Sequence, residues 1–164
     1  MNDVASNTIK RILSSVIFLP FYTWAVITNQ FYSLPILFIS LLVTLVATYE
    51  FYKLNDNRYK GKSFYKIGMT SCFLINILIY FYAYGSQIGL PFTLNEKHIM
   101  GFITILITVI LAFQLYTRPM DGGSHSISIT FFGIFYIAFS FSHIILMKSL
   151  SNGLFYILLM YFVI

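Results

Sequence analysis

The feature that most constrains the fold is a series of apolar runs that recur along the chain. A transmembrane helix needs roughly 20 apolar residues to cross a hydrocarbon core of about 30 Å. Five runs are long enough to predict full spans: Ile12 to Thr28, Phe31 to Thr48, Ile67 to Tyr84, His98 to Tyr116, and Ile127 to Met147.

A sixth apolar run begins near Leu154 and stops at Ile164. Its 11 residues correspond to about 16 Å of helix, roughly half of what a span requires. We therefore expect one transmembrane helical domain over residues 1–164, with five full helices and a truncated sixth that ends inside the membrane.

Composition supports an all-α, polytopic integral membrane protein. Of the 164 residues, 59% are hydrophobic and 9% are charged, which is too little polar side chain to coat a soluble globule. The first run could pass for a secretory signal, but Ala25 and Ile27 do not fit a cleavage site and a second run follows at once. We interpret it as an uncleaved first helix.

The distribution of lysine and arginine predicts the orientation. Eight of the ten cations precede the first run, or lie between the second and third or the fourth and fifth, and two lie on the other side. Cytoplasmic connections carry the excess of such residues, so we expect a cytoplasmic N-terminus. Five of the eight fall in one short loop: Lys53, Arg58, Lys60, Lys62 and Lys66. They either only set the topology or are also attracted to anionic headgroups, by about 1 kcal/mol each. Nucleic-acid binding has no support beyond this charge.

Polar residues within the apolar runs need partners in hydrocarbon. These residues are Asn76, Gln114 and His143, and Asn76, the most central, is expected to hydrogen-bond a neighbouring helix, although it could line a site. His143 has no second histidine, cysteine or carboxylate at helical spacing, so a ligand role is not favoured. The lone Cys72 is expected to be a small core or lipid-facing residue.

Small residues in the fifth run predict a packing face. Ser126, Gly133 and Ser140 are seven apart, which places them along one side of a regular helix. Before this run, Gly122, Gly123 and Ser124 resemble a phosphate-binding loop, but no lysine follows. Capping of the helix by Asp121 or Ser124 explains the same residues.

No catalytic group can be assembled from the acidic residues. They are Asp3, Glu50, Asp56, Glu96 and Asp121. Glu96 is predicted on the opposite side of the membrane from the others, and Glu50 and Asp56, six apart, would point in different directions on a helix. Metal-assisted phosphoryl chemistry needs carboxylates gathered around its ions. The residues alone therefore predict no catalytic, cofactor or metal site.

Three stretches together resemble the N-terminal half of the phosphatidate cytidylyltransferases, the CDP-diacylglycerol synthases. They are "KRILSSVIFLPFYTWAVI", "ATYEFYKL", and the segment from "ISITFFGIFYIAFSFSHIILMKSL" to the end of the chain. The second is similar to the family's aromatic-Glu-aromatic-x-x-Leu helix ending. Within it, the residues that match the family pattern or could anchor at the interface are Tyr49, Glu50, Phe51, Tyr52 and Leu54.

The resemblance implies transfer of CMP from CTP to phosphatidate, giving CDP-diacylglycerol and pyrophosphate in phospholipid biosynthesis. It also implies Mg²⁺, a multi-pass protein of the cell (inner) membrane, and a homodimer or a companion chain that carries the catalytic half. The family's catalytic segments have no counterpart here, so an incomplete or split enzyme is expected, and the purified chain should not turn over CTP. A scaffold, a transporter-like protein and an inactive remnant are the alternatives.

Glu50 is expected to have a structural role at the cytoplasmic membrane surface. Tyr49, Phe51 and Tyr52 would act as interfacial aromatic anchors around it, and Lys53, three residues on, could be its ion-pair partner.

Overall fold

The computed structural model describes residues 16, 19–28, 30–57, 62–91, 93–117 and 122–163. These residues are helical or lie in short connections, and no strand occurs among them. After a helical stretch over residues 19–27, the elements are η1 (Gln30–Ser33), α2 (Leu34–Asp56), α3 (Tyr65–Ile88), α4 (Glu96–Thr117), α5 (Gly123–Phe132), η2 (Gly133–Phe139), α6 (Ser140–Ser149) and α7 (Gly153–Val163).

Four helices in the described part of the chain are long and apolar enough to cross a membrane: Phe31–Asp56, Tyr65–Ile88, Glu96–Thr117 and Gly123–Ser149. The shortest has 22 residues, or about 33 Å of helix, against a core of about 30 Å. The expected all-helical membrane protein is therefore confirmed.

The expected count of five full spans and a truncated sixth is only partly supported. Most of Ile12 to Thr28 lies outside the described residues, so that helix is seen only from residue 19. The orientation inferred from the cations remains a prediction. The last helix, α7, has 11 residues.

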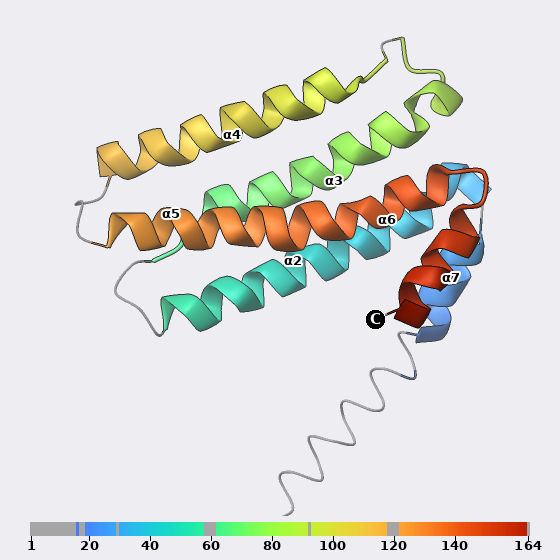
Figure 1. Cartoon of the computed structure of the whole chain (residues 1–164), viewed down its shortest axis with the longest axis horizontal. Coiled ribbons are helices and arrows are strands. Elements are labelled where there is room, and N and C mark those ends of the chain that lie inside the picture. The colour runs from blue at the N-terminus through green and yellow to red at the C-terminus, as the bar shows by residue number, and fades with distance from the viewer. Residues whose placement is uncertain are drawn as a thin grey trace, which may run out of the picture.

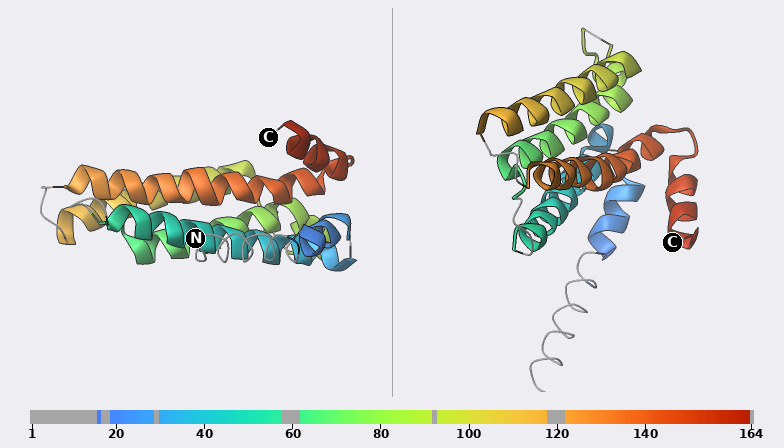
Figure 2. Two further views of the ribbon diagram at one scale, coloured as in Figure 1. Left: turned by 90° about the horizontal axis from the view of Figure 1, so that it is seen from below. Right: turned by 60° about the vertical axis from the view of Figure 1, so that its left-hand side comes forward.

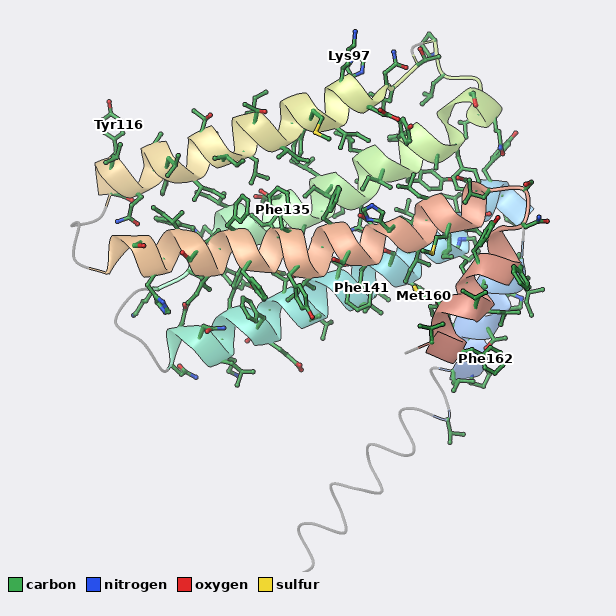
Figure 3. All side chains as sticks on the ribbon, in the orientation of Figure 1. Lys97, Tyr116, Phe135, Phe141, Met160 and Phe162 are labelled. Carbon is green, nitrogen blue, oxygen red and sulfur yellow. The ribbon has the colours of Figure 1, made fainter. Side chains whose placement is uncertain are left out.

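The core forms where α2, α3 and the continuous span of α5, η2 and α6 pack together. Figure 1 shows these elements running side by side, and the left view of Figure 2 shows the α5–α6 span as a layer over α2 and α3. In the most apolar 18-residue stretch of Gly123–Ser149, half of the residues are buried. In the corresponding stretch of α4 only 17% of the residues are buried, because α4 lies at the edge of the bundle and packs against α3 and α5. Tyr116 at its end points away from the bundle and is 90% exposed (Figure 3).

The buried face of α2 carries Ile36 and Ile39 near its start and polar side chains further along. Ser40, Thr44, Thr48 and Tyr52 recur every fourth position and are all buried, whereas Phe38, Leu42 and Val46 are exposed. In a bilayer the surrounding lipid is as apolar as leucine, so hydrophobicity does not select the inward face. Small and hydrogen-bonding side chains select it instead.

The polar face of α2 meets a complementary face of α3. Ser40 donates its hydroxyl to Asn76 Oδ1 over 2.7 Å, and Asn76 Nδ2 donates to the Cys72 carbonyl over 2.9 Å. Two turns further along α2, Thr48 Oγ1 lies 3.5 Å from Cys72 Sγ. The predictions that Asn76 bonds a neighbouring helix and that Cys72 is a small core residue are confirmed.

A π-helical segment interrupts the last long span. Residues Gly133–Phe139 form π turns between α5 and α6. The predicted packing face is correct for Ser126 and Gly133, which are buried, and wrong for Ser140, which is exposed. Regular helical geometry would return seven residues to one face, but π turns bond i to i+5 and rotate the following residues away.

The interhelical bond of Ser40 allows a stability prediction. Ser40→Ala should lower the free energy of unfolding by about 0.6 kcal/mol and by no more than about 1.7 kcal/mol, the range for such bonds in membranes. The measurement is unfolding in mixed micelles or by steric trapping in bilayers. Ser86→Ala, at an exposed position of α3, is the matched control and should leave stability unchanged. Equal effects of the two substitutions would contradict the assignment.

Candidate functional site

The residue at the centre of the candidate site is Tyr52, near the C-terminal end of α2. Its side chain is 0% exposed. A Cβ built on either Gly68 of α3 or Gly133 of η2 would lie 2.7 Å from Tyr52 Cζ, closer than real Cβ atoms approach. The phenol ring therefore occupies space that only glycine leaves open on both neighbouring helices. We call Tyr52, Gly68, Thr130 and Gly133 the Tyr52 packing site.

Thr130 fixes the polar end of this site. The Tyr52 hydroxyl donates to the Thr130 carbonyl oxygen over 2.9 Å. The Phe64 backbone N–H, at the start of α3, donates to Thr130 Oγ1 over 2.8 Å, and that hydroxyl donates in turn to the Ser126 carbonyl over 2.8 Å. One threonine thus joins the end of α2, the start of α3 and the body of α5. Buried polar groups with such partners give directional specificity that apolar packing lacks.

The connection from α2 to α3 is closed by a carboxylate. Asp56 Oδ1 accepts the Ser63 backbone N–H over 2.6 Å, and Asp56 Oδ2 accepts the Ser63 hydroxyl over 3.0 Å. Because Ser63 and Phe64 are buried, these bonds hold the first residues of α3 against the bundle. Asp56 therefore has a structural role in this turn.

The residues of the "YEFYKL" motif separate into two groups. Glu50 and Leu54 are exposed, and Tyr49, also exposed, contacts Tyr65 edge to face at 5.9 Å between ring centroids. Phe51 is half-buried, 5.5 Å from the ring of Phe132.

The assignment of Tyr52 as an interfacial anchor was wrong. Its position four residues beyond Thr48 continues the buried face of α2, and the glycines of two other helices accept its ring. No pattern within α2 alone distinguishes it from Tyr49, because the space it fills belongs to α3 and η2.

Lys53 does not pair with Glu50. Among the described residues these two form no ion pair, and the Lys53 ammonium instead lies 5.9 Å from the centroid of the Tyr49 ring. A cation within about 6 Å of an aromatic face is attracted by the ring quadrupole. The exposed surface near the C-terminal end of α2 therefore carries a contact between Tyr49 and Lys53, and Glu50 is exposed next to it.

The other polar candidates stay apart from the Tyr52 packing site. Gln114 is buried near the end of α4, where its amide packs against Gly123. His143 Nδ1 lies 2.7 Å from the Phe139 carbonyl, and its ring contacts that of Phe139 at 4.6 Å between centroids. Both residues serve packing within or between neighbouring helices.

The glycine-containing loop also has a structural explanation. Gly122 is the N-cap of α5 with φ of 75°, and no side-chain cap bond is made by this residue. Capping by Ser124 is therefore wrong, because that residue lies inside α5. Asp121 lies outside the described residues. Gly123 packs so closely on Gln114 that a Cβ there would lie 2.6 Å from Nε2.

A divalent cation does not fit the carboxylates that the structure describes. Within the described ranges, no three or more His, Cys, Asp or Glu residues gather into a group that could hold a metal ion. Both oxygens of Asp56 already accept hydrogen bonds from Ser63, and Glu50 lies exposed on another part of α2. We assign no residue of this region to Mg²⁺.

A sequence model of the cytidylyltransferase family matches residues 9–164, almost the full length of the chain. The chain belongs to the cytidylyltransferase family. The match includes all four long helices and the complete Tyr52 packing site. Comparisons with curated proteins and with solved structures gave no match.

The sequence of this cytidylyltransferase-family chain shows the "YEFYKL" motif, but it does not show which residues contact Tyr52. Gly68 and Thr130 carry no distinguishing signal in the sequence, because single small residues are common in membrane helices. The available signal was the four-residue repeat of Ser40, Thr44, Thr48 and Tyr52, which marks one face of α2. That repeat would have placed Tyr52 inside the bundle.

The close approach at Gly68 gives the next prediction. Gly68→Ala should lower the free energy of unfolding by about 1–3 kcal/mol, the usual cost of overpacking, because the added Cβ collides with the Tyr52 ring. The matched control is Gly101→Ala on α4, where a Cβ meets nothing within 4 Å.

A double-mutant cycle separates this collision from a general effect of alanine. In the background of Tyr52→Ala the ring is gone, so Gly68→Ala should cost clearly less than in the natural chain. Unfolding in mixed micelles measures all four proteins. A cost that is the same in both backgrounds would show that Tyr52 and Gly68 are not in contact.

Proposed function

We propose that this chain serves in the transfer of a cytidylyl group from CTP to phosphatidate, which yields CDP-diacylglycerol for phospholipid synthesis. The observation that carries the proposal is the family match over residues 9–164. In the reaction, a phosphate oxygen of phosphatidate attacks the α-phosphorus of CTP, a new P–O bond forms, and pyrophosphate leaves with the electrons of the broken bond.

The described residues contribute a membrane scaffold with a cationic end. Lys53, Lys62 and Lys66 are exposed around the α2–α3 connection, and each cation near a membrane surface attracts anionic headgroups by about 1 kcal/mol. We propose that this end faces the cytoplasm, where CTP is found, and that it concentrates phosphatidate there. The Tyr52 packing site holds α2, α3 and α5 in fixed register directly beneath it.

The remaining features of the proposal follow from the resemblance. The reaction is proposed to require Mg²⁺, whose ligands we do not place among the described residues. The proposed setting is the cell (inner) membrane, with a homodimer or a companion chain that completes the catalytic half. Binding of nucleic acid is not part of the proposed function.

The proposal is tested in membranes of the source cells. Depletion of this chain should lower the incorporation of labelled CTP into CDP-diacylglycerol when phosphatidate is supplied, and re-expression of the natural chain should restore it. Thin-layer chromatography of the labelled lipid measures the product. Re-expression of Gly101→Ala should restore the activity fully, since that position is open.

Gly68→Ala provides the matched comparison, and it should restore less activity because it disturbs the scaffold. Immunoblotting of the membranes would separate lower abundance from lower activity per molecule. Unchanged incorporation after depletion, with phosphatidate and CTP present in excess, would exclude the proposed role and favour a scaffold, a transporter-like protein or a remnant.

A further inference from the structure

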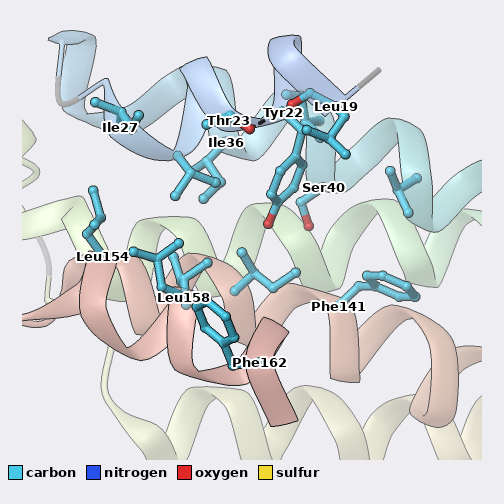
Figure 4. Close-up of a pocket in the computed structure, with 15 residues that line it drawn as sticks. Leu19, Tyr22, Thr23, Ile27, Ile36, Ser40, Phe141, Leu154, Leu158 and Phe162 are labelled. Atoms are coloured by element: carbon cyan, nitrogen blue, oxygen red, sulfur yellow. Dashed lines mark hydrogen bonds between the residues drawn. The ribbon is translucent and has the colours of Figure 1, made fainter. Parts of the chain in front are cut away.

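An apolar groove lies at the end of the bundle where α2 begins. The helical stretch 19–27 and α7 form its two walls, and α2 and α6 form its floor (Figure 4). Figure 1 shows that both walls leave the bundle at a steep angle to the long helices, so the groove is bounded by elements that turn away from them. Its volume of about 650 Å³ lies within the roughly 300–1,000 Å³ of sites that hold small ligands.

The lining of the groove is chemically uniform. Among the described residues that line it none is charged, and of their polar side chains Thr23 and Ser40 already donate their hydroxyls. Thr23 donates to the Leu19 carbonyl over 2.8 Å, and Ser40 donates to Asn76 over 2.7 Å. The third polar residue, Tyr22, carries its hydroxyl on an aromatic ring. A polar or charged ligand would lose its hydration here without an equivalent exchange.

A helix with side chains is about 10–12 Å across, so a second copy or a further membrane helix would fill a groove of about 650 Å³ only with the side chains of one of its faces. A single hydrocarbon chain is narrow enough to enter.

The groove also lies in one half of the membrane. Its floor on α2 extends from Ile36 to Val43, and 13 residues separate Val43 from Asp56 at the other end of that helix. This is about 20 Å, more than half of a hydrocarbon core of about 30 Å. A lipid in the leaflet at the α2–α3 connection is therefore too far away, and the occupant must come from the leaflet where α2 begins.

A positive charge marks the end of the groove near the loops. Lys148, in the last turn of α6, is 8% exposed, and its ammonium donates to the Val26 carbonyl. Val26 lines the groove, and so does Ile144, one turn before Lys148. An ammonium has three donors and this bond uses one. The charge complements a phosphate headgroup at that end, with its acyl chain running along the groove.

We propose that this groove binds one acyl chain of an anionic phospholipid from the leaflet at the N-terminal end of α2. The site is separate from the cationic end at the α2–α3 connection, and the inference does not rest on the proposed cytidylyl transfer. The lipid would fill the space between the two splayed walls and hold them at a fixed angle to the bundle.

Photocrosslinking in vesicles tests the proposal. The full chain is reconstituted with phosphatidylglycerol that carries a diazirine in one acyl chain, or with phosphatidylcholine that carries the same acyl chain. Labelled peptides are mapped by mass spectrometry. We expect labelling to concentrate on the groove-lining parts of α2, α6 and α7, with more from phosphatidylglycerol than from phosphatidylcholine.

Two variants that fill the groove serve as the decisive comparison. Val43→Trp on the floor and Leu158→Trp on the α7 wall should each cause loss of the groove labelling. Ile105→Trp, at an exposed position of α4 outside the groove, should retain it. Circular dichroism and a single elution peak verify folding of each variant, and two independent positions keep the test valid if one fails to fold.

Several outcomes would overturn the proposal. Labelling spread evenly over α4 and the groove would show only general contact with the bilayer. Unchanged labelling in both folded tryptophan variants would place the lipid elsewhere, and crosslinks between two copies through the groove would assign it to self-association. Equal labelling by the two probes would overturn the assignment to an anionic lipid.

Discussion

The structure depends on one aromatic ring that fits between two glycines. Tyr52 fills space that Gly68 and Gly133 leave open, and its hydroxyl bonds the carbonyl of Thr130. Because three helices meet at this ring, their register is set there, and the polar face of α2 then aligns with Asn76 and Cys72 of α3. Membrane helices gain little from burying one another's apolar surface, so such close packing and specific bonds decide their arrangement.

The two ends of the bundle are built differently. At the α2–α3 connection, Asp56, Ser63 and Thr130 form a compact hydrogen-bonded closure beneath exposed lysines. At the opposite end, the helical stretch 19–27 and α7 diverge and leave the apolar groove. One end is suited to anionic groups at the membrane surface, and the other to hydrocarbon within the bilayer. The proposed chemistry and the proposed lipid site therefore occupy separate places.

Much of the fold was predictable from the apolar runs, because their length is dictated by the thickness of the bilayer. The positions of the long helices and the membrane character followed from them. The inward faces did not follow from hydrophobicity. On α2, Phe38 and Leu42 are exposed while Ser40, Thr44 and Thr48 are buried, so hydropathy alone does not place the core.

The sequence alone determined that the chain is a helical membrane protein and, through "YEFYKL" and two further stretches, which family it resembles. Only the tertiary structure decided what that motif does. Glu50 and Tyr49 remain exposed on α2, while Tyr52 enters the core, because the space that receives it is formed by glycines 16 and 81 residues further along the chain. The π turns between α5 and α6, after which Ser140 is exposed, are likewise seen only in the structure. Contacts between distant segments cannot be inferred from the local spacing of either one.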